Sequence, residues 1–299
     1  MFTKACLIFN PTAGQGDPVE ELVKIREVLE PKINLDIIPS HKGISTLELT
    51  QQAISKDAQI ILIAGGDGTI SSAAEALIGI KIPVGIIPRG TVNAFAKALN
   101  IPIDIKAACE TILSGKPRIV DTAICNGKPM IVLTGIGLEA DTIKQTNRKL
   151  KNYFGMLAFI IAGIQELRKL KTFKTCIETE SEIINCQAVA VTIANTAAST
   201  SLLAHGSAGV IADDGLLDVT IFAPRNQKNA FFAAYNLLRS GFTGNAIIRD
   251  DIQHFRTNYV KVKTEPMQQV SLDGDSLGIT NVEINSIPQS LTILVPALS

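Results

Sequence analysis

The first 100 residues alternate between short apolar runs and segments of helical periodicity, and this alternation limits the fold more than any other feature of the chain. The apolar runs at 5–10, 33–38, 58–64 and 82–87 are expected to be strands. Helices are expected from Pro18, with Asp17 as the N-cap, and over 45–56, 69–77 and 92–99. The almost continuously apolar run at 58–64 is typical of a parallel strand buried on both faces. The pattern therefore predicts βαβ units and a doubly wound α/β sheet.

Short strands and turns dominate after about residue 120. Strands are expected at 119–125, 130–134, 188–194, 217–222, 259–263, 269–272, 282–284 and 290–295, with Asn126-Gly127 as a hairpin turn. Two helical segments, around 152–170 and 228–240, interrupt these strands. We therefore predict an α/β domain over 1–124 and a β-rich domain over 125–299.

Composition argues against several classes of function. Lys and Arg total 28 and Asp and Glu total 28, so the basic footprint of a nucleic-acid-binding protein is missing. The five cysteines are scattered without a CxxC pair, which predicts reduced thiols in a cytoplasmic protein. The longest apolar stretch, at 153–164, is too short to span a bilayer as a helix.

The segment Gly65-Gly66-Asp67-Gly68-Thr69 lies between an expected buried strand and an expected helix. Glycines allow the backbone to approach a ligand closely, and a helix N-terminus suits an anion. Asp67 is unsuited to a phosphate unless it holds a metal or accepts a proton. Taken alone, the motif is also compatible with a tight strand-to-helix turn.

Two further loops of small residues, at 10–14 and 90–93, follow strands of the same predicted sheet. In a doubly wound sheet, the loops at the carboxyl ends of the strands gather at one edge, where ligands bind. Three such loops together are more typical of a phosphate-binding edge than of unrelated turns.

The segments Asn-Pro-Thr-Ala-Gly at 10–14, Gly-Gly-Asp-Gly-Thr at 65–69 and Pro-Arg-Gly-Thr-Val-Asn at 88–93 resemble the catalytic domain of diacylglycerol kinases, of sphingosine and ceramide kinases, and of bacterial soluble lipid kinases. The resemblance continues at 136–140, 213–218 and 272–275, and so covers most of the chain. It implies an α/β nucleotide-binding domain, of the type shared with NAD kinases, followed by a β-sandwich domain whose last strand can return to the first. It also implies a magnesium-dependent kinase that uses ATP to phosphorylate a lipid hydroxyl.

The resemblance implies a role for individual residues. ATP contacts are expected at Asn10, Pro11, Thr12, Ala13, Gly14, Ser40, Gly65, Gly66, Asp67, Gly68, Thr69 and Thr91. The base that accepts the proton of the substrate hydroxyl is Asp275, where bacterial relatives usually have glutamate, or Asp67, as in the sphingosine-kinase branch. These two assignments stay open at the level of the sequence.

Metal sites are expected on the same grounds, because phosphoryl transfer needs charge neutralisation and Mg²⁺ prefers carboxylate oxygen. Asp67 and Asp121 match a magnesium–water network, and Asp214 matches a structural magnesium site with the main-chain carbonyls of Ile211 and Leu216. The chain departs from the family pattern at two positions. Ser72 replaces a glutamate and Ala94 replaces an aspartate, which leaves fewer carboxylates for metal.

Two other functions remain open, NAD kinase and a non-catalytic nucleotide- or lipid-binding regulator. The expected partner is a lipid at a membrane surface, and a homodimer is an open alternative to a monomer. The segment 144–174 has eight basic residues and one acidic residue around an apolar centre. It suits an interfacial helix that binds anionic lipid, or a helix buried in the core with solvated ends.

Overall fold

The computed structural model describes residues 2–41, 43–137, 172–198, 210–226, 229–230, 236 and 249–297. The chain divides into two units, Met1–Thr122 with Gln289–Ser299, and Ala123–Pro288. It passes from the first unit to the second after Thr122 and returns before Gln289.

The first unit alternates strands and helices as the sequence predicts. In order, its elements are β1 (Lys4–Phe9), α1 (Pro18–Leu29), β2 (Asn34–Pro39), α2 (Thr46–Ser55), β3 (Ile60–Gly65), α3 (Asp67–Leu77), β4 (Val84–Pro88), α4 (Ala94–Ala98) and α5 (Ile105–Ser114). Helix α5 was not predicted, although Asp104 caps it and its buried residues Ala108, Cys109 and Ile112 have helical spacing. Helix α3 begins at Asp67, two residues earlier than expected, so the glycine-rich motif includes the first turn of the helix.

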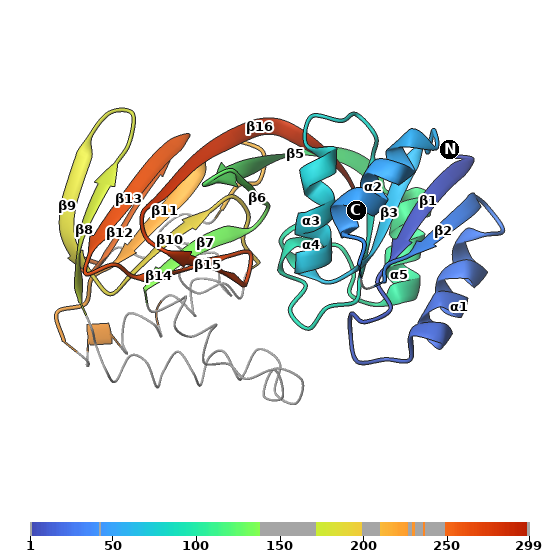
Figure 1. Ribbon diagram of the computed structural model, residues 1–299, viewed down its shortest axis with the longest axis horizontal. Coiled ribbons are helices and arrows are strands. Elements are labelled where there is room, and N and C mark those ends of the chain that lie inside the picture. Colours follow the sequence, from blue (N-terminus) through green and yellow to red (C-terminus); the bar gives the residue numbers. More distant parts are fainter. Residues whose placement is uncertain are drawn as a thin grey trace. The chain divides into compact units, whose positions relative to one another are not determined.

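The sheet of the first unit is parallel, in the order β2-β1-β3-β4 (Figure 1). The final part of β16 (Val282–Val295) extends it, since Ile293 pairs in parallel with Val84 of β4. All six residues of β3 are buried. Apolar residues of α1 and α5, among them Ile25 and Ile112, pack with β1 and β3 in one core cluster. This doubly wound arrangement is the predicted one.

Apart from the helical residues 229–230 and 236, the regular structure described in the second unit consists of strands. They are the end of β5 (Lys116–Cys125), then β6 (Lys128–Met130), β7 (Leu133–Gly137), β8 (Phe173–Glu178), β9 (Ile183–Ala188), β10 (Ala190–Ala194), β11 (Leu217–Phe222), β12 (Ile252–Thr257), β13 (Tyr259–Glu265), β14 (Gln269–Leu272), β15 (Asp275–Ile279) and the first part of β16. The hairpin turn at Asn126-Gly127 is confirmed, with both residues at positive φ.

After residue 122, two strand predictions have the wrong bounds, and two others are confirmed as strand but belong to one longer element. The expected strand at 130–134 spans the end of β6 and the start of β7, because the backbone N–H groups of Ile131 and Val132 bind the carboxylate of Asp273 and not a neighbouring strand. The expected strand at 188–194 is divided between β9 and β10, and those at 282–284 and 290–295 are parts of the single strand β16. The predicted helix at 152–170 and most of the one at 228–240 lie outside the described residues.

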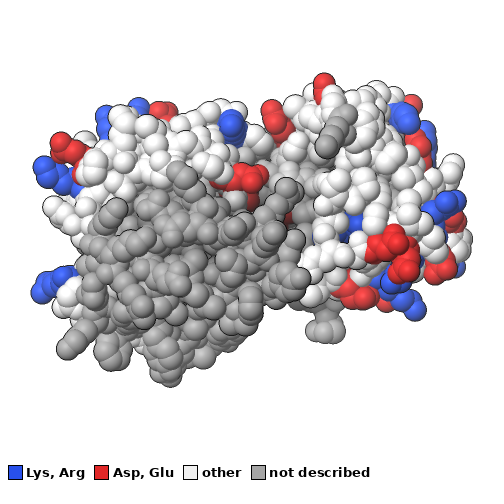
Figure 2. Space-filling model, turned by 60° about the horizontal axis from the view of Figure 1, so that its bottom comes forward, with Lys and Arg blue, Asp and Glu red and all other residues white. Residues whose placement is uncertain are grey.

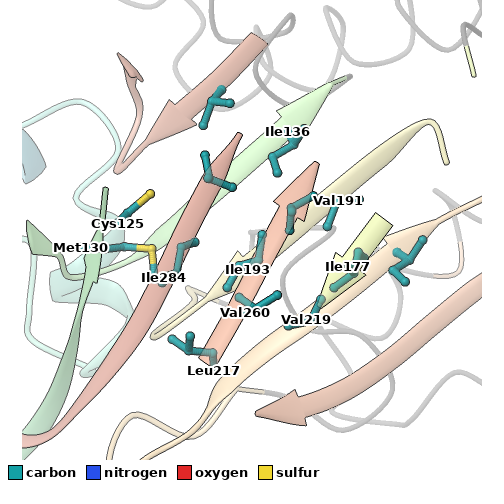
Figure 3. Packing of buried hydrophobic residues seen from close by; sticks show 14 of the residues in the cluster. Cys125, Met130, Ile136, Ile177, Val191, Ile193, Leu217, Val219, Val260 and Ile284 are labelled. Carbon is teal, nitrogen blue, oxygen red and sulfur yellow. The ribbon is translucent and has the colours of Figure 1, made fainter. Parts of the chain in front are cut away.

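The strands of the second unit form two antiparallel layers. One has the order β16-β13-β8-β9 and the other β12-β11-β10-β7-β14-β15. Ile177, Val260 and Ile284 from the first layer pack with Val191 and other apolar side chains from the second in one buried cluster (Figure 3). The predicted β-sandwich is therefore confirmed.

Charge is mixed on the described surface. Figure 2 shows Asp and Glu side chains close to Lys and Arg side chains over the coloured part of this face. None of the helices in the described residues is long and apolar enough to cross a membrane. All five cysteines are described and none forms a disulfide.

Candidate active site

Three loops lie at the carboxyl ends of the parallel strands β1, β3 and β4. They are the first loop (residues 10–16), the second loop (65–69) and the third loop (88–93). Main-chain hydrogen bonds continue the sheet into them, since Asn10 N donates to Ala64 O at 2.9 Å and Arg89 N donates to Gly65 O at 2.8 Å. Ser40 follows β2 at the same edge, and its N–H donates to Phe9 O at 2.7 Å. The structure thus brings the predicted ATP-contacting segments together.

Asn10 connects the first loop to the second. Its Nδ2 donates to Thr69 Oγ1 at 2.9 Å, and its Oδ1 accepts both the N–H and the hydroxyl of Thr12, at 3.0 and 2.9 Å. The side chain of Thr69, at the end of the second loop, is buried and packs against Gly65 at its start. A Cβ on Gly65 would lie 2.6 Å from the Thr69 side chain. Position 65 therefore requires glycine for steric reasons.

The second and third loops are in backbone contact. A Cβ on Gly66 would lie 3.1 Å from the Cα of Gly90, and a Cβ on Gly90 would lie 2.7 Å from the Cα of Gly66. Two glycines facing each other allow this approach, because side chains on both would separate the loops. Thr91, further along the third loop, is exposed to solvent.

Asp67 holds the start of helix α4, which directly follows the third loop, through its carboxylate. Its Oδ2 accepts the N–H of Ala94 at 3.0 Å and its Oδ1 accepts the N–H of Phe95 at 3.1 Å, so that Asp67 caps helix α4. The N-cap residue of that helix, Asn93, instead uses its side chain to bind the main chain of Gly90, at 2.7 and 2.8 Å. Asp67 is half-buried. The sequence predicts a catalytic or metal-binding role for this residue, and the structure adds a structural one.

Asp121, the second carboxylate of the predicted magnesium network, lies in β5 and is 1% exposed. Its Oδ1 accepts the N–H of Gln289 at 2.7 Å, and the hydroxyl of Thr122 lies 2.8 Å from that of Ser290. Both contacts join β5 to β16. Among the described residues, no group of three or more His, Cys, Asp or Glu side chains is placed to hold a metal by itself.

The second predicted magnesium site lies in a turn before β11 in the second unit. Asp214 Oδ1 accepts the N–H of Leu216 at 3.0 Å, and its Oδ2 lies 3.5 Å from the guanidinium of Arg256. Arg256 also donates to the buried carboxylate of Asp218 at 2.9 Å, and this hydrogen bond raises the pKa of the arginine. The metal-site candidate therefore sits beside a permanent positive charge, a feature that the sequence did not reveal.

Asp275, one of the two candidate bases, is exposed at the start of β15. It follows a two-residue turn, in which Asp273 and Gly274 have φ of 48° and 91°. The carboxylate of Asp273 accepts three backbone N–H groups, those of residues 131, 132 and 133, at 2.8–3.0 Å. Asp273 thus anchors the turn that presents Asp275. The rest of the motif at 136–140, from residue 138 on, lies outside the described residues.

Two residues close to these loops were missed by sequence reasoning. Arg89 and Glu21 form an ion pair at 2.5 Å, and the arginine side chain is fully buried. The sequence offered one signal for this pair. Arg89 lies inside the third loop among small residues, and Glu21 lies one helical turn after the first loop.

Comparison with families of known proteins covers both units. Residues 4–125 match the diacylglycerol kinase catalytic domain, and residues 131–295 match the YegS C-terminal NAD kinase beta sandwich-like domain. An uncharacterized protein of Synechocystis is 40% identical over 301 residues, which is 97% of this chain and 70% of the relative. A diacylglycerol kinase of Bacillus subtilis is 27% identical, over 98% of this chain and 96% of the relative.

Solved structures agree with these sequence matches. A protein of Bacillus anthracis, provisionally assigned as a diacylglycerol kinase, superposes with a TM-score of 0.79 at 26% identity. The match covers 98% of this chain and 97% of the other.

Proposed function

Because the chain belongs to the diacylglycerol kinase catalytic-domain family, we propose that it transfers the γ-phosphoryl group of ATP to a hydroxyl of a diacylglycerol-like or related lipid. Membership of a kinase family itself implies a phosphotransferase that uses ATP as donor. The lipid acceptor, its position at a membrane surface and the use of magnesium are the parts that we propose.

The observation that carries the proposal is the joining of the three loops at one sheet edge. The Asn10–Thr69 hydrogen bond, the Gly66–Gly90 contact and the Asp67 cap of α4 hold them together. Phosphoryl transfer depends mainly on positioning and electrostatic stabilisation. The main-chain N–H groups at the start of α3 would supply both the positioning and the electrostatic stabilisation for a triphosphate.

Magnesium fits the residues that are present. Asp67 and Asp121 offer carboxylate oxygens, and a metal held by so few side chains would need further oxygens from phosphates and water, as Mg²⁺ commonly has. When bound, the ion would neutralise charge on the phosphate oxygens. Asp214 with the carbonyls of Ile211 and Leu216 is also an all-oxygen donor set, and we propose it as the structural site. A cation there would compete with the guanidinium of Arg256, which lies 3.5 Å from Asp214 Oδ2.

Asp275 is our proposed base for the acceptor hydroxyl. It is exposed, and the anchored turn at Asp273 holds its backbone in place. Asp67 already accepts two N–H groups, which fits a residue that orders the loop and binds a cation better than one that moves a proton. A general base needs access to the proton that it accepts.

The proposal is tested by supplying γ-labelled ATP and magnesium with separate acceptors. These are vesicles containing diacylglycerol, phosphatidylglycerol or a long-chain base, and NAD in solution. We expect label in a lipid, and no label when Asp67→Asn replaces the parent. Label in NAD would instead identify an NAD kinase, and ATP binding without transfer to any acceptor would identify a regulator.

A further inference from the structure

Arg89 lies in the third loop, where an arginine would ordinarily be taken for a phosphate ligand. Its side chain is completely buried, and its guanidinium lies 4.3 Å from the centre of the Phe9 ring. Nη1 donates to the main-chain carbonyl of Asn10. Phe9 ends β1 and Asn10 begins the first loop, so Arg89 reaches from the third loop beneath the first.

Glu21 of helix α1 provides the counter-charge. Arg89 Nε donates to Glu21 Oε2 at 2.6 Å, and Nη2 lies 2.5 Å from the same oxygen. The other oxygen, Oε1, lies directly under the first loop, because a Cβ on Gly16 would come within 2.3 Å of it. A Cβ on Gly14, where φ is +84°, would come within 2.6 Å of the Arg89 carbonyl oxygen. The first loop therefore contacts the Glu21 carboxylate at Gly16 and the main chain of Arg89 at Gly14.

We propose that Arg89 and Glu21 act as positioning residues, which hold the first loop in the shape that receives phosphate and do not contact the nucleotide themselves. This inference rests on the proposed function for its nucleotide, although the loop geometry can be measured without one. The guanidinium contacts the Phe9 ring, the Asn10 carbonyl and Glu21, and none of the side chain is exposed. Nη2 meets Glu21 as an ion pair without hydrogen-bond geometry, so Glu21 is its counter-charge. Removing the Glu21 charge leaves a buried cation without compensation, so the loop above it must rearrange.

The test uses two variants and a matched control in the full chain. Glu21→Gln keeps the shape of the side chain and removes its charge. Glu21→Leu/Arg89→Met removes both charges, and folding should survive because no buried charge is left unpaired. Glu30→Gln is the control, since Glu30 lies beside the same helix and pairs with Arg26 in an exposed ion pair. Amide hydrogen exchange of residues 10–16 and of β3 is measured without nucleotide, and ATP binding is measured separately.

We expect both test variants to lose exchange protection at 10–16 while β3 keeps its protection, and to lose kcat/KM by about 100-fold, as displacement of a positioning group by about 1 Å can cause. Glu30→Gln should match the parent. If only the double variant weakens ATP binding, Arg89 is a phosphate ligand and the inference fails. Equal loss of protection in the loop and β3, or unchanged protection in both variants, also overturns it. A parent that binds no ATP refutes the proposed function, and the exchange data still decide the inference.

Discussion

Asp67→Asn separates two roles of one carboxylate, the cap of α4 that the structure shows and the part in phosphoryl transfer that we propose. Both oxygens of Asp67 accept main-chain N–H groups of α4, at 3.0 and 3.1 Å. Asparagine retains one accepting oxygen, so the N–H of either Ala94 or Phe95 loses its acceptor. The N-cap residue of α4, Asn93, makes no side-chain hydrogen bond to the helix that could replace it. Loss of one such hydrogen bond costs about 0.5–1.5 kcal/mol. We therefore expect a melting temperature about 2–6 °C below that of the parent.

This expectation revises the prediction from sequence alone, in which the fold does not need Asp67. Asp104→Asn is the matched control, because Asp104 caps α5 with a single hydrogen bond, from Ala107 N to Oδ1 at 2.9 Å, which asparagine can accept equally well. Thermal unfolding by circular dichroism and label transfer from ATP are measured on both variants. Asp67→Asn should also lose at least about 100-fold in turnover, as loss of one group that stabilises transition-state charge can cause, and Asp104→Asn should lose none.

The two readouts refute different parts of the reasoning. If Asp67→Asn melts at the temperature of Asp104→Asn, the carboxylate is not needed to cap α4. If Asp67→Asn keeps near-normal turnover, the residue has no essential part in phosphoryl transfer. A variant that is destabilised yet fully active would leave Asp67 with its structural role alone.

Three more predictions follow from individual contacts. Gly66→Val should weaken ATP binding strongly and lower the melting temperature, because its side chain meets the third loop; unchanged ATP affinity in a calorimetric titration would contradict this. Asp275→Ala should lose turnover with ATP affinity and melting temperature unchanged, whereas Asp273→Ala should be destabilised, since three backbone N–H groups lose their acceptor. If Asp275→Ala loses ATP binding instead, the residue is a nucleotide ligand. Burial raises the pKa of Cys6 from 9.0 to about 11 and that of Cys109 to about 12. As the pH rises, these thiols ionise in the unfolded chain before they ionise in the folded chain. Their contribution to the free energy of unfolding is therefore fully present below about pH 9 and should be lost progressively toward pH 11–12, as urea unfolding would measure. The fall should be less steep in a Cys6→Ala/Cys109→Ala variant.

Local patterns in the sequence were sufficient for the alternation of strands and helices up to residue 99 and for the turn at Asn126-Gly127. Buried parallel strands are apolar throughout, and a two-residue turn with positive φ at both positions selects Asn-Gly. The rule that loops meet at the carboxyl edge of a parallel sheet then grouped the motifs at 10–14, 65–69 and 88–93 correctly. Each of these inferences needs only residues that are close in the sequence, or a property that all doubly wound parallel sheets share.

Contacts between distant residues needed the tertiary structure. Asp67 caps a helix 27 residues away, Arg89 pairs with Glu21 across 68 residues, and Asp273 binds N–H groups some 140 residues earlier. Residue type allows each of these side chains many partners, because a carboxylate accepts from any N–H group within reach. Which group comes within reach is decided by strand order and by the packing of helices on the sheet. The sequence by itself therefore determined which loops meet at one edge of the sheet, and only the folded chain decided which of their polar side chains hold the loops in place.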